Sequence, residues 1–325
     1  MRSVEKAFLL CEADYARDFE ERVIPTLARA RQEFLHTTKN GTQLYAVRYD
    51  AQQPRGTVVL LHGLGESAEK YREMCYYFLK SGYTVLAFDQ RGHGRSTRQV
   101  EVGLVHTARF LDYAEDLHGL LCEAEAQLPT PRYLYAHSMG GAVAALYLAR
   151  YPGFFQKAVL SSPMIAMQYK GVPRFLGYVA CTVLRLLGRG KKRFVGMSPS
   201  PSPEQECVER TEAQSVSRFE AYRKLKLTEP RFHAARPTVV WVHEALRCTR
   251  DILKKGAPEG IAIPVRVYAA ELETLVLEAP QRAFAARLPR GEFRLVVGAK
   301  HEIYFAGDEI LHPYMSEVLE FFGND

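Results

Sequence analysis

The chain alternates short apolar runs, rich in Val, Leu and Tyr, with longer amphipathic segments. The apolar runs predict β-strands at residues 57–61, 83–88, 133–135, 158–160, 265–268 and 293–297. The amphipathic segments predict helices at residues 68–80, 110–127, 142–150 and 280–288. Residues 41–49 predict an antiparallel edge strand that precedes them. Strands that alternate with helices build a mostly parallel sheet, so we expect an α/β fold with helices flanking a central sheet.

The alternation stops between residues 164 and 236, where the pattern changes to amphipathic helix and a loop rich in Ser and Pro at 198–203. We therefore predict that residues 1–163 and 237–325 form the core, and that residues 164–236 form a helical cap. The net charge of the chain is +6, and the predicted cap carries 14 Lys and Arg against 6 Asp and Glu. The excess of positive charge therefore lies in the predicted cap.

Composition excludes several classes of protein. The chain lacks the basic blocks with interleaved aromatic residues that nucleic-acid binding requires, so we expect no nucleic-acid partner. Its six cysteines lie far apart without a C-x-x-C pair, which favours reduced thiols over a zinc site or a disulfide framework. The apolar run at 7–10 is too short for a signal peptide, and no run reaches the ~20 residues of a membrane span. These features predict a cytoplasmic protein.

A candidate nucleophile lies where the strand at 133–135 meets the helix that follows it. The connecting sequence is Ala136-His137-Ser138-Met139-Gly140-Gly141. A serine on a sharp strand-to-helix turn with small neighbours is a nucleophile elbow, in which the next backbone N–H, that of Met139, can bind an oxyanion. The usual motif has glycine where this chain has Ala136. The alternative is a serine that only caps the helix, and we interpret His137 as a packed structural residue.

A glycine-rich turn follows the strand at 57–61 and reads His62-Gly63-Leu64-Gly65-Glu66. Its glycine spacing also fits a dinucleotide-binding fingerprint, with Asp89 as the ribose-binding acid. That interpretation leaves His62, residues 89–96 and the elbow unexplained. A hydrolase uses such a turn to supply a second oxyanion-binding N–H, here that of Leu64. We therefore predict no cofactor or metal, and we interpret residues 89–96 as scaffold for the site.

A hydrolase triad on this fold runs in the order Ser, acid, His, with the acid and the base on loops after late strands. His301 follows the strand at 293–297 and is the predicted base, and His312 is the weaker candidate. Glu271 and Glu273 follow the strand at 265–268 and are the candidate acids. We favour Glu273, because its spacing to the following apolar pair matches the usual acid loop.

Five segments resemble the bacterial lysophospholipases close to monoglyceride lipases within the α/β-hydrolase superfamily. They are LAFDQRGHGRS (86–96), RFLDYAEDL (109–117), YAHSMGGA (135–142), RPTVVWVHEAL (236–246) and GAKHEIYF (298–305).

The resemblance implies a serine hydrolase that cuts a single-chain acyl glycerolipid into a fatty acid and a polar head, without cofactor or metal. Alanine before HSMGG and glutamate in the acid loop resemble the lysophospholipase branch, whereas HGLGE resembles the turn of monoglyceride lipases. Lysophospholipid and monoacylglycerol both remain open as substrates. The alternatives are a general carboxylesterase or peptidase, and a catalytically silent binding protein.

One segment of the predicted cap combines an apolar helical stripe with a basic cluster at 188–193 (GRGKKR). This pattern is typical of an ordinary cap helix with a solvated basic loop, or of a helix that lies on an anionic membrane. The second interpretation predicts peripheral contact with the inner membrane surface through Lys191, Lys192 and Arg193. The stripe consists of Val172, Phe175, Leu176, Val179, Val183, Leu186 and Leu187.

Overall fold

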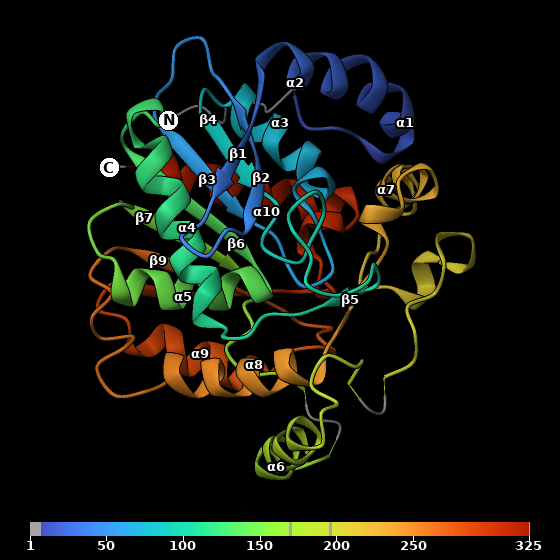
Figure 1. Ribbon diagram of the computed structural model, residues 1–325. Coiled ribbons are helices and arrows are strands. Elements are labelled where there is room, and N and C mark those ends of the chain that lie inside the picture. Colours follow the sequence, from blue (N-terminus) through green and yellow to red (C-terminus); the bar gives the residue numbers. More distant parts are fainter. Residues whose placement is uncertain (1–7, 169–170, 195–196, 325) are drawn as a thin grey trace.

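The computed structural model describes residues 8–168, 171–194 and 197–324, and an eight-stranded sheet forms its centre (Figure 1). The strand order is β1-β2-β4-β3-β6-β7-β9-β10. The β1–β2 and β2–β4 pairs are antiparallel, and all other pairs in this sheet are parallel. The strands are β1 (Arg31–Thr37), β2 (Gln43–Tyr49), β3 (Thr57–Leu61), β4 (Thr84–Phe88), β6 (Arg132–His137), β7 (Lys157–Ser161), β9 (Val265–Ala270) and β10 (Gly291–Val296).

Helices cover both faces of the sheet (Figure 1). One core contains α4, α5, α8 and α9, and the other contains α1, α2, α3 and α10. Successive residues of β3 alternate between these two cores, as the two-residue period of a strand requires. The helices are α1 (Tyr15–Asp18), α2 (Ile24–Ala30), α3 (Arg72–Lys80), α4 (Leu111–Ala124), α5 (Met139–Arg150), α6 (Arg174–Leu186), α7 (Val216–Thr228), α8 (Val239–Ile252), α9 (Glu278–Arg287) and α10 (Asp308–Gly323).

The strands predicted after residue 50 are all present and run parallel to one another, so the predicted central sheet is confirmed. The prediction that residues 41–49 form an edge strand is wrong, because β1 pairs along the outer side of β2. The β1 sequence, Arg-Gln-Glu-Phe-Leu-His-Thr, is mostly polar because it borders solvent, and it therefore lacks the apolar pattern that reveals a strand.

Among the described residues between β7 and β9, three α-helices occur: α6, α7 and α8. Helix α6 packs against α8, and it projects from the body of the molecule (Figure 1). Helix α8 packs in turn against α5 of the core. A two-stranded parallel pair, β5 (Leu104–Val105) with β8 (Arg236–Pro237), joins the end of this region to the core. The strand β8 was not predicted, since two residues carry no periodicity. In the described part of the chain, no helix is long and apolar enough to cross a membrane.

Candidate active site

Ser138 lies at the junction between β6 and α5, in an unusual backbone conformation. Its φ is 52° and its ψ is −116°, a region that residues with a side chain rarely adopt. The surrounding backbone holds it there, because Ser138 N–H donates to Ser161 O at 3.0 Å and Met164 N–H donates to Ser138 O at 2.9 Å. Strand β7 and the loop after it therefore keep the serine on its strained turn.

The two glycines after Met139 allow α5 to start close to neighbouring backbone. A Cβ on Gly140 would lie 2.6 Å from the carbonyl oxygen of Leu61, at the end of β3. A Cβ on Gly141 would lie 2.5 Å from the Cβ of Pro163. Both contacts are too short for any other residue, so the elbow requires glycine at both positions.

Ser138, His301 and Glu273 form a continuous line of hydrogen bonds. His301 Nε2 lies 2.8 Å from Ser138 Oγ, and His301 Nδ1 lies 2.6 Å from Glu273 Oε2. Glu273 Oε1 accepts hydrogen bonds from the backbone N–H groups of Leu275 at 2.8 Å and Val276 at 3.3 Å. Both oxygens of the carboxylate therefore have partners that fix its orientation. This is the bonding pattern of a Ser–His–acid triad.

The two rival residues lie elsewhere. Glu271 Oε2 accepts a hydrogen bond from Gly298 N–H at 2.8 Å, and its side chain is exposed. His312 lies in α10, where its Nε2 donates to the carbonyl oxygen of Leu10 at 2.9 Å. In the described part of the chain, neither residue has a hydrogen bond to Ser138 or His301.

Burial and pairing set the charges of the predicted triad. The side chains of His301 and Glu273 are only 4% and 6% exposed. Burial acts to lower the pKa of His301, but the hydrogen bond and the charge of Glu273 outweigh it, and the pKa lies above its ordinary value. Burial acts to raise the pKa of Glu273, but His301 and the two backbone N–H groups hold it below its ordinary value. The pair therefore favours a carboxylate that stabilises an imidazolium.

The predicted oxyanion donors lie on two segments that contact each other. A Cβ on Gly63 would lie 3.1 Å from His137 Cδ2, so the turn after β3 packs against the elbow. Met139 is the first residue of α5, and its N–H has no acceptor within the helix. Leu64 N–H donates to no group in the described part of the chain. Their role in binding an oxyanion stays a prediction.

A buried charged network, which sequence reasoning missed, supports this turn. Glu66 Oε2 accepts from Gly63 N–H at 2.6 Å and from the Tyr71 hydroxyl at 2.5 Å. Lys70 Nζ lies 2.8 Å from Glu66 Oε1 and 2.6 Å from Glu302 Oε1. The pair Glu66 and Lys70 has the i,i+4 spacing of a helical ion pair, but only the tertiary structure adds Glu302, the neighbour of His301.

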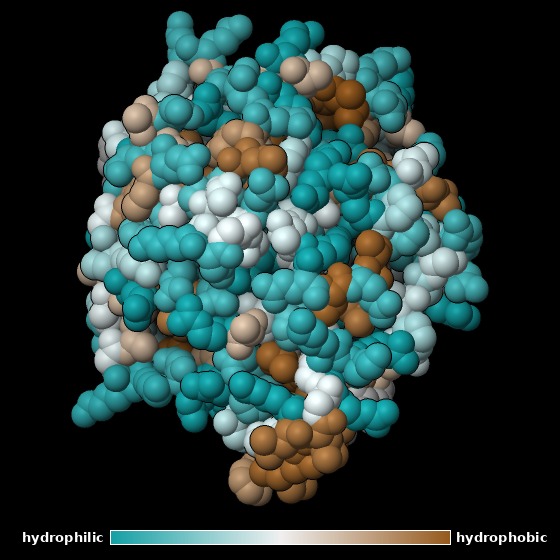
Figure 2. Space-filling view, in the orientation of Figure 1, coloured by the Kyte–Doolittle hydropathy of each residue, from teal (hydrophilic) through white to brown (hydrophobic). Residues whose placement is uncertain are grey.

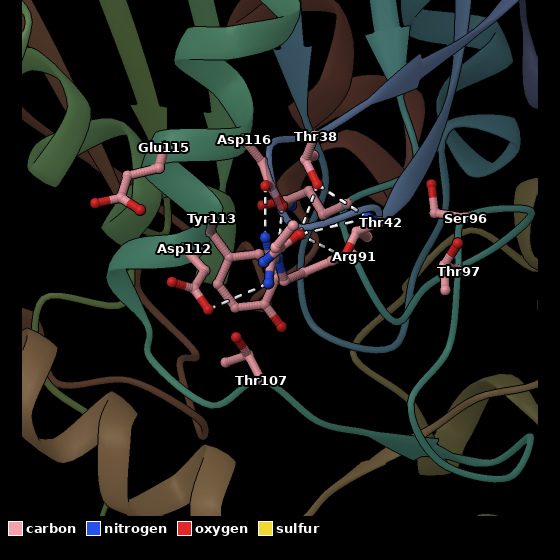
Figure 3. A network of polar contacts seen from close by, with 12 residues as sticks. Thr38, Thr42, Arg91, Ser96, Thr97, Thr107, Asp112, Tyr113, Glu115 and Asp116 are labelled. Carbon is pink, nitrogen blue, oxygen red and sulfur yellow. Dashed lines mark hydrogen bonds and ion pairs between the residues drawn. The ribbon is translucent and has the colours of Figure 1, made fainter.

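Residues 89–96 form the scaffold that we predicted. Gln90 N–H donates to His62 Nε2 at 2.9 Å, which fixes the first residue of the glycine-rich turn at 62–66, the predicted oxyanion turn. Arg91 pairs through two nitrogens with Asp116 at 2.5 Å each, and with Asp112 at 3.1 Å (Figure 3). Both aspartates lie on α4, so these buried ion pairs connect the loop to the helix layer. The carboxylate of Asp89 accepts the backbone N–H groups of Ala68 and Arg95 at 2.7 Å each, and it thereby holds the same loop.

His137 packs behind the triad, as predicted for a structural histidine. Its ring centroid lies 4.8 Å from that of His301 and 5.0 Å from that of Tyr304. Burial lowers the pKa of His137 to about 3, so the ring is neutral at physiological pH. It contributes packing without adding charge beside His301.

The α/β-hydrolase class is defined by a mostly parallel sheet with a serine on a strained strand-to-helix turn. An acid and a histidine follow that serine in sequence, each in a loop after a late strand. Solved structures agree on the fold. A monoglyceride lipase from Saccharomyces cerevisiae is 18% identical, with a TM-score of 0.69 over 90% of this chain and 95% of that one. A carboxyl esterase from Bacillus coagulans is 20% identical, with a TM-score of 0.72 over 90% and 98%.

Sequence comparison identifies the family. Residues 52–308 match the model of the serine aminopeptidase S33 family, and the chain belongs to that family. It is 31% identical over 307 residues to lysophospholipase L2 of Escherichia coli K12, covering 90% of this chain and 88% of the relative. It is 29% identical over 264 residues to monoacylglycerol lipase of Mycolicibacterium smegmatis, covering 80% and 86%. These matches confirm the predicted carboxylic ester hydrolase of the lysophospholipase and monoacylglycerol lipase group.

Proposed function

We propose that the protein is a lysophospholipase that hydrolyses the acyl ester of a single-chain glycerophospholipid through Ser138, His301 and Glu273. The observation that carries this proposal is the pair of hydrogen bonds at His301, 2.8 Å to Ser138 Oγ and 2.6 Å to Glu273 Oε2. Together they give the imidazole a nucleophile on one nitrogen and an orienting carboxylate on the other.

The geometry supports a two-step reaction. Ser138 Oγ attacks the ester carbonyl while His301 Nε2 takes its proton, and the N–H groups of Leu64 and Met139 bind the oxyanion that develops. The intermediate collapses when the imidazolium returns the proton to the leaving alcohol, which leaves an acyl-Ser138. Water then attacks the acyl group with the same base, and the fatty acid leaves. Glu273 stabilises the imidazolium in both steps.

The polar head distinguishes this proposal from its alternatives. Relatives carry the names lysophospholipase L2 and monoacylglycerol lipase, so monoacylglycerol is the second candidate substrate. A general carboxylesterase or peptidase would favour short acyl chains or amides. A silent binding protein would need no ordered triad. A panel of lipids assayed by fatty-acid release separates these functions. Faster release from monoacylglycerols or short esters than from lysophospholipids would overturn the proposal.

We also propose that residues 164–236 form a cap over the site. Helices α6 and α7 lie in this range, and its first residues contact the elbow, since Met164 N–H donates to Ser138 O. At the other end, an added Cβ on Gly65 in the oxyanion turn would lie 2.9 Å from Ala235 O. One end of the range therefore adjoins Ser138, and the other adjoins the turn that carries Leu64.

The outward face of α6 supports peripheral contact with an anionic membrane. The apolar stripe faces solvent, with Phe175 71% and Leu186 81% exposed. Figure 2 shows an extensive brown patch at the end of the molecule where α6 lies in Figure 1. The exposed side chains of Lys191, Lys192 and Arg193 follow directly, and basic residues near an anionic surface contribute about 1 kcal/mol each. Apolar and cationic groups on one surface complement a membrane that carries anionic lipids.

Vesicle sedimentation tests this contact. We expect the protein to bind phosphatidylglycerol vesicles, and binding to weaken with salt because the Debye length falls from about 10 Å at 0.1 M to about 3 Å at 1 M. The variant Phe175→Asp/Leu186→Asp should bind these vesicles less, and it should still hydrolyse a small soluble ester. Vesicle binding that is absent, or that is unchanged by salt and by both substitutions, would overturn the membrane role.

A further inference from the structure

A cationic hollow lies between the loop at 99–104 and the basic cluster at 188–193. Its volume is about 710 Å³. Four basic side chains and one acidic side chain line it, together with the apolar side chains of Leu184, Phe194 and Val239. The charged lining residues are Arg189, Lys191, Lys192, Arg193 and Glu101.

The cluster at 188–193 is held in place by the start of α8. Val239 N–H donates to Lys192 O at 3.0 Å, and Val240 N–H donates to Gly190 O at 3.0 Å. These carbonyl groups satisfy N–H groups of the first turn of α8, which have no partner within the helix. These hydrogen bonds therefore fix the backbone of the loop against α8, and the loop side chains line the hollow in a defined arrangement.

The positive charge of the hollow is not neutralised by the protein. Within the described part of the chain, Arg189, Lys191 and Lys192 form no ion pair, and Arg193 Nε donates to the carbonyl oxygen of Met197 at 3.0 Å. Glu101 is the one carboxylate among the lining residues. A cavity with four cations and a partly apolar wall favours a ligand that is anionic and also carries hydrocarbon.

A second hollow of about 310 Å³ adjoins the first. The two share Glu101, Leu104 and Arg193, and the second is also lined by Arg236. Arg236 Nε is buried and has no hydrogen-bond partner in the described structure. A buried N–H without an acceptor is costly, so a side-chain movement that brings Arg236 Nε into contact with an anion in the hollow would be favourable.

Ala235, the residue before Arg236, contacts the predicted oxyanion turn. An added Cβ on Gly65 would lie 2.9 Å from Ala235 O and 3.1 Å from Ala235 N, so the two backbones are in contact. Leu64, the predicted oxyanion donor, precedes Gly65, and Arg236 follows Ala235. The contact between Gly65 and Ala235 therefore places the backbone of Arg236 next to the turn that carries Leu64.

We propose that Arg236 and Arg193 bind the phosphate of a lysophospholipid headgroup while its acyl ester lies at Ser138. In such a lipid only the glycerol backbone separates the ester from the phosphate, and in the protein the contact between Gly65 and Ala235 connects the turn at 62–66 to Arg236. The planar guanidinium fork matches phosphate oxygens, and the lysines add charge. The proposal rests on the proposed function and names the residues that select a lysophospholipid over a monoacylglycerol.

Calorimetry on the Ser138→Ala protein tests this without turnover. The ligands are a short-chain lysophosphatidylglycerol below its micellar concentration, the monoacylglycerol with the same chain, and inorganic phosphate. We expect the lysophospholipid to bind more tightly than the monoacylglycerol. Adding Arg193→Gln/Arg236→Gln should reduce the ratio of the two affinities by about 10- to 100-fold, the loss typical of charged hydrogen bonds. Adding Lys255→Gln, which removes an exposed cation outside both hollows, should leave the ratio unchanged.

Each arm gives a decisive result. An unchanged ratio in the Arg193→Gln/Arg236→Gln protein, with its thermal unfolding matching the parent, would overturn the headgroup site. Phosphate that binds the parent protein without competing with the lysophospholipid would also overturn it, because the hollow would then be a site for free phosphate. Fatty-acid release by the native enzyme tests the proposed function separately, since binding to the Ser138→Ala protein does not depend on chemistry.

Discussion

Replacing the two candidate acids one at a time distinguishes their roles most sharply. In Glu273→Gln the amide oxygen can still accept the N–H groups of Leu275 and Val276, which turns the amide NH₂ toward His301 Nδ1. That contact favours the tautomer with hydrogen on Nε2, which cannot accept the proton of the serine. The matching substitution in another serine hydrolase lowers kcat by ~10⁴, which corresponds to about 5 kcal/mol in the activation barrier.

Glu271→Gln is the matched control in the same loop. Its amide oxygen can keep the hydrogen bond from Gly298 N–H, and the side chain is exposed, so we expect kcat close to that of the native enzyme. The assay is kcat on a soluble ester, normalised by fluorophosphonate titration of intact sites. If Glu271→Gln is the more damaging change, the acid is Glu271 and the assignment of Glu273 is refuted.

Three further predictions concern the same site. Ser138→Ala should fold normally, lose fluorophosphonate labelling and lose kcat by a factor on the order of 10⁶, and near-normal turnover would exclude the serine mechanism. Activity should rise with pH through a midpoint above the ordinary ~6.5 of histidine, because the pKa of His301 is raised and the base must be neutral; a flat profile from about pH 5 to 8 would contradict this. Lys70→Met should reduce the free energy of unfolding by about 3–5 kcal/mol in a denaturant titration, because it leaves the buried Glu66 and the partly buried Glu302 without their cation. A change below about 1 kcal/mol would argue against the network.

Local patterns in the sequence determined most of the core. Buried strands such as β3 and β9 consist mostly of apolar residues because they are covered on both faces, and their composition reveals them without tertiary information. The elbow is equally local, since the strained turn at Ser138 and the small residues that permit it are contiguous. His301 was predicted because its loop follows the last strand, and chain order alone restricts where the base can lie.

Only the tertiary structure brought together groups that are distant in sequence. Glu271 and Glu273 are two residues apart in one loop, and the choice between them depends on where His301 Nδ1 lies in space. The same holds for Glu302 beside Lys70, and for Arg236, whose proximity to the oxyanion turn comes from a backbone contact between Ala235 and Gly65. Hydrophobic periodicity specifies which residues are buried, but partners at long sequence separation are set by how the packed elements meet.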